Sequence, residues 1–173
     1  MSIKFCAIDP SIACTALTIL QHVEGDKFEV VDKVSLNTKG VKYPSRWAKK
    51  IAMYDMFRFW LNTRIEDISF FVIENYSYGS AGHLADLGEL NGMFKYYIWK
   101  HDKAIDVIAP ASVKKIITGD GRSKKDVVAK EVVKFISNTI INFNNTDESD
   151  SAAIGIAYAI QMMRIENEQE KDS

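Results

Sequence analysis

IKFCAIDP, residues 3–10, and SFFVIE, residues 69–74, are the stretches that decide the fold of this chain. Short, continuous apolar runs of this kind are typical of strands that are covered on both faces of a sheet. Pro10 has no N–H group to donate to a β-ladder, so the first strand is expected to end at Asp9. The second strand ends at Glu74. The two stretches indicate an α/β fold in which helices cover the sheet.

The segments around these strands are predicted to complete a mixed five-stranded sheet flanked by helices. Strands at residues 13–21 and 27–36, joined by a turn, indicate an antiparallel meander at the start of the chain. A further strand at residues 104–109 and the helices between the later strands indicate βαβ units. The predicted helices cover residues 46–61, about 80–101, 111–117, a segment with Ser123 as its N-cap, and a last segment with Asp147 at its start.

The composition is that of one globular domain. With 173 residues, 47% of them hydrophobic, the chain can bury one core but has no room for a second ordinary domain. We expect residues 1–165 to form the domain and residues 166–173 to be a polar tail that frays. No apolar run reaches the length of a membrane span and no secretory signal is recognisable, so we expect a cytoplasmic protein. Cys6 and Cys14 lack a CxxC spacing and are expected to be buried free thiols.

The net charge of −1 argues mildly against nucleic-acid binding, but the charges are unevenly distributed. Acids gather between residues 147 and 150 and in the C-terminal tail. A nuclease needs acids for its metal ions, so a near-neutral total is compatible with a basic groove. The bases gather in two segments, at Lys39, Lys42, Arg46, Lys49 and Lys50, and at Lys114, Lys115, Arg122, Lys124 and Lys125.

Four acids are candidates for one functional site. Asp9 and Glu74 each end a predicted buried strand, and ligands gather at the carboxyl ends of the strands in α/β sheets. Asp147 and Asp150 are three residues apart at the start of the last helix, so both point to one side. Taken alone, this pair is more often a helix cap than a ligand pair. The small and apolar sequence behind it, SAAIGIAYA, indicates a helix that packs closely on the sheet and brings both acids to the strand ends.

Four carboxylates without a suitable histidine or cysteine set predict a site for a hard divalent cation. Such oxygen ligands favour Mg²⁺, for which Mn²⁺ can substitute, over zinc. Two ions about 4 Å apart can activate a water molecule and stabilise the leaving oxygen of a phosphodiester. We therefore expect a two-ion phosphodiesterase with no small-molecule cofactor.

The segments that carry these residues resemble the RuvC family of Holliday junction resolvases. FCAIDPSIACTAL, FFVIENYSYG, APASVKKIITGDGRSKKDVV and TDESDSAAIGIAYA follow the family's order and approximate spacing, and the similarity extends to about residue 163. The resemblance implies an RNase H-like fold, a homodimer, and Mg²⁺-dependent paired nicking of four-way DNA junctions. It also implies that Asp9, Glu74, Asp147 and Asp150 are the catalytic acids.

Bases on both sides of the glycine loop GDG are candidates for DNA binding. Lys114 matches a DNA-contacting lysine of the family. Lys125 matches the lysine that follows the family's loop, which implies that it stabilises the reacting phosphate. Lys115, Arg122 and Lys124 are further candidates, although any one of these bases alone would be interpreted as part of a solvated surface.

The sequence departs from the family's pattern in its first motif and in its aromatic residues. Ser11 stands where the family usually has glycine. The aromatic residue that family members insert into the junction has two candidates here, Tyr76 and Tyr78, and either could instead pack on its own loop. The chain is also less basic than cellular members, which resembles the phage-encoded branch of the family.

A stripe of small residues on the helix at about 80–101 is a candidate dimer interface. Ala81, Ala85, Gly88 and Gly92 recur on one narrow face of this helix. Two symmetric cuts need two active sites, and a two-fold junction suits an isologous dimer. Close packing against another helix of the same subunit is the alternative.

The sequence therefore predicts an endonuclease that resolves four-way and other branched DNA by paired symmetric nicks. A less selective nuclease that prefers flaps, or one that acts on RNA, has the same fold and is an alternative. A junction-binding protein without activity is a more distant one. Asp-Pro-Ser-Ile after a strand also resembles the phosphate loop of actin-like sugar kinases, but the chain is too short for their two domains.

Overall fold

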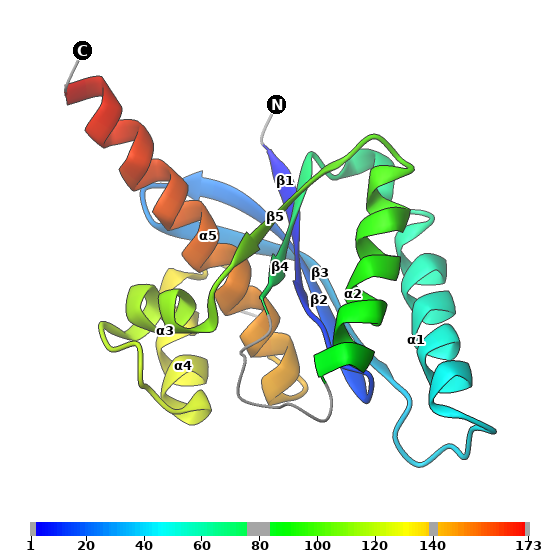
Figure 1. The fold of residues 1–173 in the computed structure, drawn as a ribbon. Helices are drawn as coiled ribbons and strands as arrows, with labels where there is room; N and C mark the ends of the chain where they lie inside the picture. Colours follow the sequence, from blue (N-terminus) through cyan, green and yellow to red (C-terminus); the bar gives the residue numbers. More distant parts are fainter. Residues whose placement is uncertain (1–2, 76–83, 139–141, 172–173) are drawn as a thin grey trace.

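The computed structural model describes residues 3–75, 84–138 and 142–171 (Figure 1). Its elements follow the order that the sequence predicts. The strands are β1 (Lys4–Asp9), β2 (Cys14–Glu24), β3 (Lys27–Asn37), β4 (Phe70–Glu74) and β5 (Ala104–Ile108). The α-helices are α1 (Arg46–Leu61), α2 (Leu84–Trp99), α3 (Pro110–Thr118), α4 (Lys125–Val132) and α5 (Thr146–Lys171), and short 3₁₀ turns lie at Ile65–Asp67 and Val133–Phe135.

The five strands form one mixed sheet in the order β3-β2-β1-β4-β5. β1 pairs antiparallel with β2, and β2 pairs antiparallel with β3. β4 pairs in parallel with both β1 and β5. The predicted mixed sheet, with its meander first and its parallel strands after, is confirmed.

Alternate residues of β1 point into two separate cores. Phe5 and Ala7 belong to the core that α3, α4 and α5 cover, whereas Cys6 and Ile8 belong to the core that α1 and α2 cover. All four side chains are at most 2% exposed. Figure 1 shows α1 and α2 as one pair of helices and α5 crossing the sheet with α3 and α4 beside it. The continuous apolar sequence of β1 therefore reflects burial on both faces, as predicted.

The long helix α5 comes unusually close to β1 and β2 at Gly155. A Cβ atom added to Gly155 would lie 2.5 Å from Leu20 Cδ1, 2.9 Å from Ala7 Cβ and 3.2 Å from Phe5 Cε2. A side chain larger than hydrogen would therefore displace the helix or its neighbours. The predicted close packing of the small residues behind Asp150 on the sheet is confirmed.

One detail at a helix start differs from the prediction. Ser123 does not cap α4, because Lys124 is the N-cap and the Ser123 hydroxyl instead shares a 2.7 Å hydrogen bond with Thr118 Oγ1 at the end of α3. α5 continues to Lys171 although its side chains are exposed from residue 164 to residue 170. Helical hydrogen bonds lie within the segment itself and do not require burial. Within the described residues, every helix is too short or too polar to cross a membrane.

The stripe of small residues on α2 faces outward. Ala85 and Gly92 are exposed and Gly88 is half-buried, and a Cβ atom added to Gly92 would meet nothing within 4 Å. The alternative that a helix of the same subunit covers the stripe is therefore wrong for Ala85 and Gly92. Ala81, the first residue of the predicted stripe, lies outside the described residues.

Candidate active site

β1 and β4 bring Asp9 and Glu74 to the same edge of the sheet. Asp9 is the last residue of β1, and Glu74 is the last residue of β4. The two strands are parallel, with Ile8 opposite Ile73, so the acids that follow lie at adjacent strand ends. The strand-end positions predicted for both acids are confirmed.

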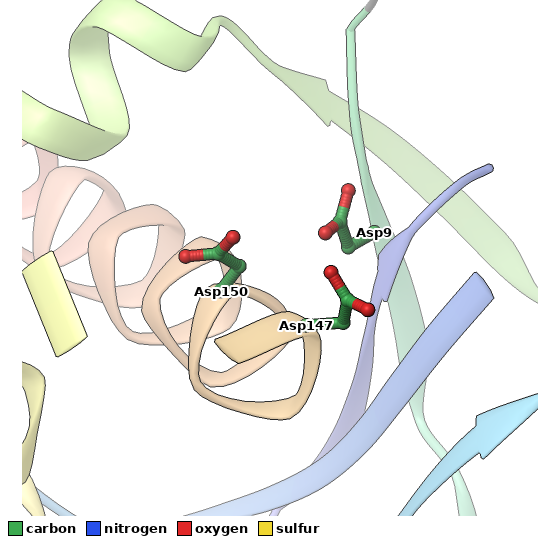
Figure 2. A group of neighbouring side chains, drawn as sticks. All are labelled: Asp9, Asp147 and Asp150. Carbon is green, nitrogen blue, oxygen red and sulfur yellow. The ribbon is translucent and has the colours of Figure 1, made fainter. Parts of the chain in front are cut away.

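Two acids from the first turns of α5 join Asp9. Asp9, Asp147 and Asp150 each offer a carboxylate oxygen, and these oxygens lie within 4.8 Å of one another. Figure 2 shows the three side chains where the first turns of α5 meet the end of β1. The N–H of Glu148 in the first turn is capped by Asn145 Oδ1 at 3.0 Å, so this cap does not come from Asp147 or Asp150.

Glu74 lies beside the three aspartates. It is not one of the acids whose oxygens lie within 4.8 Å of one another. Its charge nevertheless acts on Asp9 more strongly than that of either α5 acid. Asp9 thus lies close to Asp147 and Asp150 and is also affected by the charge of Glu74. A cavity of about 290 Å³ is lined, among other residues, by Asp9, Glu74, Lys114, Lys125 and Asp150.

The crowding of buried acids opposes their ionisation. Burial, and after it the charge of Glu74, raises the pKa of Asp9 to about 8. Burial and the charge of Asp150 raise the pKa of Glu74 to about 7. Burial also raises the pKa of Asp150, although its hydrogen bond with Lys125 acts in the opposite direction. A divalent cation among these carboxylates would favour their ionised forms and release the protons that they hold.

Lys125, the first residue of α4, supplies a positive charge next to the acids. Its Nζ donates a hydrogen bond to Asp150 Oδ2 at 2.6 Å. Burial lowers the pKa of Lys125, but the hydrogen bond and the charge of Asp150 outweigh this and raise it overall. The ammonium group therefore stays charged at neutral pH.

The other predicted DNA contacts lie partly in the cavity and partly on the exposed surface. Lys114 lines the same cavity as Asp9 and Glu74. Lys115 on α3, and Arg122 and Lys124 in the segment before α4, are exposed on the surface. The two candidates for the aromatic residue that inserts into the junction, Tyr76 and Tyr78, lie outside the described residues.

A buried ion pair that the sequence did not reveal fixes the start of α5. Glu148 is 3% exposed and pairs with Lys33 of β3. Its carboxylate also accepts hydrogen bonds from the backbone N–H of Asn144 at 2.9 Å and from the side-chain amide of Asn144 at 3.0 Å. Burial raises the pKa of Glu148, but the hydrogen bonds from Lys33 and from Asn144 outweigh the effect of burial and lower the pKa overall. Glu148 anchors the turn that carries Asp147 and Asp150.

Two further buried polar groups from β2 contact the same turn of α5. Thr18 Oγ1 and Ser151 Oγ share a hydrogen bond of 2.6 Å. The Cys14 thiol donates a hydrogen bond to the Asp147 carboxylate, and burial together with this bond raises the pKa of Cys14 to about 11. The thiol therefore stays protonated at neutral pH. Cys6 and Cys14 are both buried free thiols, as predicted.

The donor set fits a hard divalent cation. The three oxygens that lie within 4.8 Å of one another are all carboxylate oxygens, and no described histidine belongs to this cluster. Ions such as Mg²⁺ and Mn²⁺ bind carboxylate oxygens, whereas zinc sites usually include histidine or cysteine. The site is therefore an acidic cluster suited to divalent metal binding.

The sequence pattern of one protein family matches residues 5–160, and that family is described as crossover junction endodeoxyribonuclease RuvC. The chain belongs to the RuvC family. The matched range contains all four acids and Lys125. In a comparison with curated proteins, none matches this chain by sequence.

Solved structures of Holliday junction resolvases share the fold. Thermus thermophilus RuvC in complex with a Holliday junction substrate is 16% identical, with a TM-score of 0.76 over 91% of this chain and 93% of that chain. The yeast mitochondrial Holliday junction resolvase is 14% identical, with a TM-score of 0.65 over 99% of this chain and 86% of that chain. The fowlpox virus resolvase is 13% identical, with a TM-score of 0.54 over 90% of this chain and 97% of that chain. The predicted RNase H-like fold and endonuclease class are confirmed.

The metal-free protein should lose stability as the pH rises. A carboxyl group whose pKa is higher in the folded than in the unfolded state stabilises the fold at low pH, and this stabilisation is lost as the pH rises through the folded pKa. Asp9 and Glu74 have ordinary pKa values of 3.8 and 4.5 and folded values of about 8 and about 7. Thermal unfolding in EDTA should therefore show a melting temperature that falls between about pH 5 and pH 8.

Two comparisons test the origin of this pH dependence. Asp9→Asn should flatten the fall, because the acid with the highest pKa in the cluster no longer ionises. Mg²⁺ should raise the melting temperature more at high pH than at low pH, because it binds the ionised acids. A melting temperature with the same pH dependence in the wild type and in Asp9→Asn would contradict the electrostatic account.

Glu148→Gln should lower the free energy of unfolding by about 1–3 kcal/mol, because it leaves Lys33 without a counter-charge. This loss of stability is smaller than that expected for a fully buried ion pair, because the Lys33 side chain is 17% exposed. The variant should also bind Mn²⁺ more weakly, because the turn that carries Asp147 and Asp150 loses its anchor. Urea unfolding and Mn²⁺ titration by calorimetry measure the two effects.

Glu131→Gln is the matched control for Glu148→Gln. It breaks the pair between Lys134 and Glu131, whose side chains are 67% and 33% exposed. Such surface pairs contribute up to about 1 kcal/mol, so stability should change little and Mn²⁺ binding should not change. Equal effects of the two variants would show that Glu148 does not position the acids.

Proposed function

We propose that this chain is a Mg²⁺-dependent endonuclease that resolves four-way DNA junctions, and other branched DNA, by paired symmetric nicks. The observation that carries the proposal is the convergence of Asp9, Asp147 and Asp150 within 4.8 Å, beside Glu74, in a chain of the RuvC family. The shared fold with Thermus thermophilus RuvC bound to a Holliday junction supports DNA junctions as the substrate.

Asp9, Glu74, Asp147 and Asp150 are proposed to hold two Mg²⁺ ions, for which Mn²⁺ can substitute. Two ions in such a site activate a water molecule and stabilise the leaving oxygen of the cleaved phosphodiester. Asp9 would hold a metal ion together with Asp147 and Asp150, whose carboxylate oxygens lie within 4.8 Å of its own. The cleaved ends should be substrates for a ligase.

Lys125 is proposed to stabilise the charge of the reacting phosphate. Its side chain is 65% exposed, so it can turn from Asp150 toward a bound strand. Lys114 lines the cavity and is the proposed contact for a neighbouring phosphate, and Lys115, Arg122 and Lys124 are proposed to contact DNA farther out. Tyr76 and Tyr78 stay the candidates for the aromatic residue that inserts into the junction.

A homodimer is proposed to form through α2. The stripe of Ala85, Gly88 and Gly92 continues along the same helical face into Tyr96 and Trp99, at spacings of three and four residues. Tyr96 is 54% exposed and Trp99 is 68% exposed. If two copies of α2 pair in antiparallel, the aromatic residues of one copy face the small residues of the other. The same geometry would present two active sites to the two halves of a junction.

Replacing Gly92 by Gln should shift the protein from dimer toward monomer, because the Gln side chain would fill the open space above Gly92 that the partner's helix would occupy. Sedimentation velocity at micromolar concentrations measures the two species. Phe59→Gln, at an 85% exposed site on α1, is the control and should leave the dimer intact. A wild-type protein that sediments as a monomer at every concentration would rule out the dimer.

Incubation with a labelled four-way junction and Mg²⁺ tests the nuclease proposal. The wild type should cut symmetrically, and Asp9→Asn should still bind but cut at least about 100-fold more slowly, as is typical when a metal site is disturbed. Asp126→Asn, at an exposed acid of α4, is the control and should cut at the wild-type rate. Wild-type binding without cutting would overturn the enzymatic proposal in favour of a junction-binding protein.

The same assay with three-way junctions, flaps, plain duplex and RNA–DNA hybrid tests selectivity. Preferential cutting of the four-way junction supports a resolvase, whereas equal rates on all substrates would support a less selective nuclease. The predicted setting is the cytoplasm of a host cell during phage infection, where replicated DNA carries branches that must be removed before packaging.

A further inference from the structure

A second cleft lies directly beside the carboxylate cavity. It has a volume of about 360 Å³ and lies between the loop that joins β1 to β2 and the first turns of α1 and α2. Pro10 and Leu87 line both hollows, so the cleft continues the carboxylate cavity across the end of β1. Its remaining walls are formed by Ser11, Ile12, Ala13, Arg46, Lys49 and Asp86.

The two acids of this corner both pair with a buried lysine. Lys50 of α1 is 4% exposed and donates a hydrogen bond to Asp86 of α2 at 2.8 Å. It also forms an ion pair with Glu89 of α2. The hydrogen bond from Lys50 lowers the pKa of Asp86, so this acid stays ionised and paired. Lys50 therefore holds α1 on α2.

Two bases of α1 present positive charge to the cleft. Lys49 forms no ion pair with any residue that the structure describes. Arg46 reaches Asp86 at 3.3 Å, but its side chain is 74% exposed and Asp86 has its main partner in Lys50. Three cations, Arg46, Lys49 and Lys50, thus face two acids in this corner. The exposed Lys39 and Lys42 precede the same helix and add to the positive charge.

The floor of the cleft is a loop whose polar groups are largely used within the loop. Ser11 Oγ accepts hydrogen bonds from the N–H groups of Ala13 and Cys14. Thr15 Oγ1 accepts from the Ser11 N–H and donates to the Ser11 carbonyl. Ser11, which stands where the RuvC family usually has glycine, therefore closes the loop by accepting these bonds. Arg46 and Lys49 supply the positively charged side chains of the cleft.

The carboxylates consequently have bases on two sides. Lys114 and Lys125 line one part of the joined hollow, and Arg46 and Lys49 line the other. Figure 1 shows the first turns of α1, α2 and α5 at the same end of the molecule. Helix N-termini carry partial positive charge, which adds to the attraction for anions at this end. A ligand that spans both sides and passes over the acids needs anionic groups at regular intervals, as a nucleic-acid backbone has.

We infer that the cleft between the β1–β2 loop and the start of α1 binds backbone phosphates of the DNA, on the side of the acids opposite to α3 and α4. The inference rests on the proposed nuclease function and assigns the basic segment at residues 39–50 to substrate binding. Arg46 and Lys49 are the phosphate contacts, and Lys50 is the structural base that holds their helix in place.

The test compares two double variants that remove the same charge. Arg46→Gln/Lys49→Gln removes the two bases of the cleft, and Lys27→Gln/Arg164→Gln removes one lysine and one arginine at exposed sites far along β3 and α5 from the acids. Both are made in the Asp9→Asn protein, so that a labelled four-way junction stays intact with Mg²⁺ present. Fluorescence anisotropy over a range of KCl concentrations gives the dissociation constant and its salt dependence.

Loss of the cleft bases should raise the dissociation constant at least about tenfold and make the slope of log K against log salt less negative by about 1–2. The control pair should match the parent in both quantities. Thermal unfolding should show that both variants fold, because Lys50 and its acids are untouched. If the cleft variant and the control variant bind alike, the cleft does not hold phosphates. If the parent binds no DNA at all, the proposed nuclease function itself fails.

Discussion

The close contact of α5 with the sheet at Gly155 is the constraint on which the site depends. Two of the acids are carried by α5, and the contact behind them leaves no room even for a methyl group, since an added Cβ would lie 2.9 Å from Ala7 Cβ. A helix held farther from the sheet would carry Asp147 and Asp150 away from Asp9, and catalytic geometry is sensitive to displacements of about 1 Å. The other face of the sheet is different, because α1 and α2 meet it through large side chains.

The packing of α5 on the sheet brings buried carboxylates together, and their negative charges repel one another. The acids resist ionisation where they are buried together, and the protein compensates with fixed charges on either side of them. Lys125 neutralises Asp150 from α4, and Lys33 holds Glu148 from β3. The acids repel one another when they are ionised. The apolar core beneath α5 and the ion pairs at the edges of the site hold them together. Functional sites commonly have lower stability than the scaffold that carries them.

Much of the fold could be predicted because the signals were local. A continuous apolar run or a proline reports on its own segment, so the sheet and the strand-end positions of Asp9 and Glu74 followed from sequence. Asp147 did not follow from its own position, because an acid in a first helical turn has the same sequence whether it caps the helix or faces other acids. The small residues behind it and the family resemblance were needed to distinguish the two. The pair of Lys33 and Glu148 was missed because it depends on how β3 and α5 meet, 115 residues apart.

The site is also divided between the two ends of the chain. Asp9 ends the first strand, all five strands are complete at Ile108, and the acids of α5 begin only at Asp147. At a translation rate of about 5–20 residues per second, the 39 residues from 108 to 147 take about 2–8 s to synthesise. During that time a nascent chain has every strand of its sheet but only part of its acidic cluster. The strands of the sheet are therefore synthesised before the helix that carries Asp147 and Asp150.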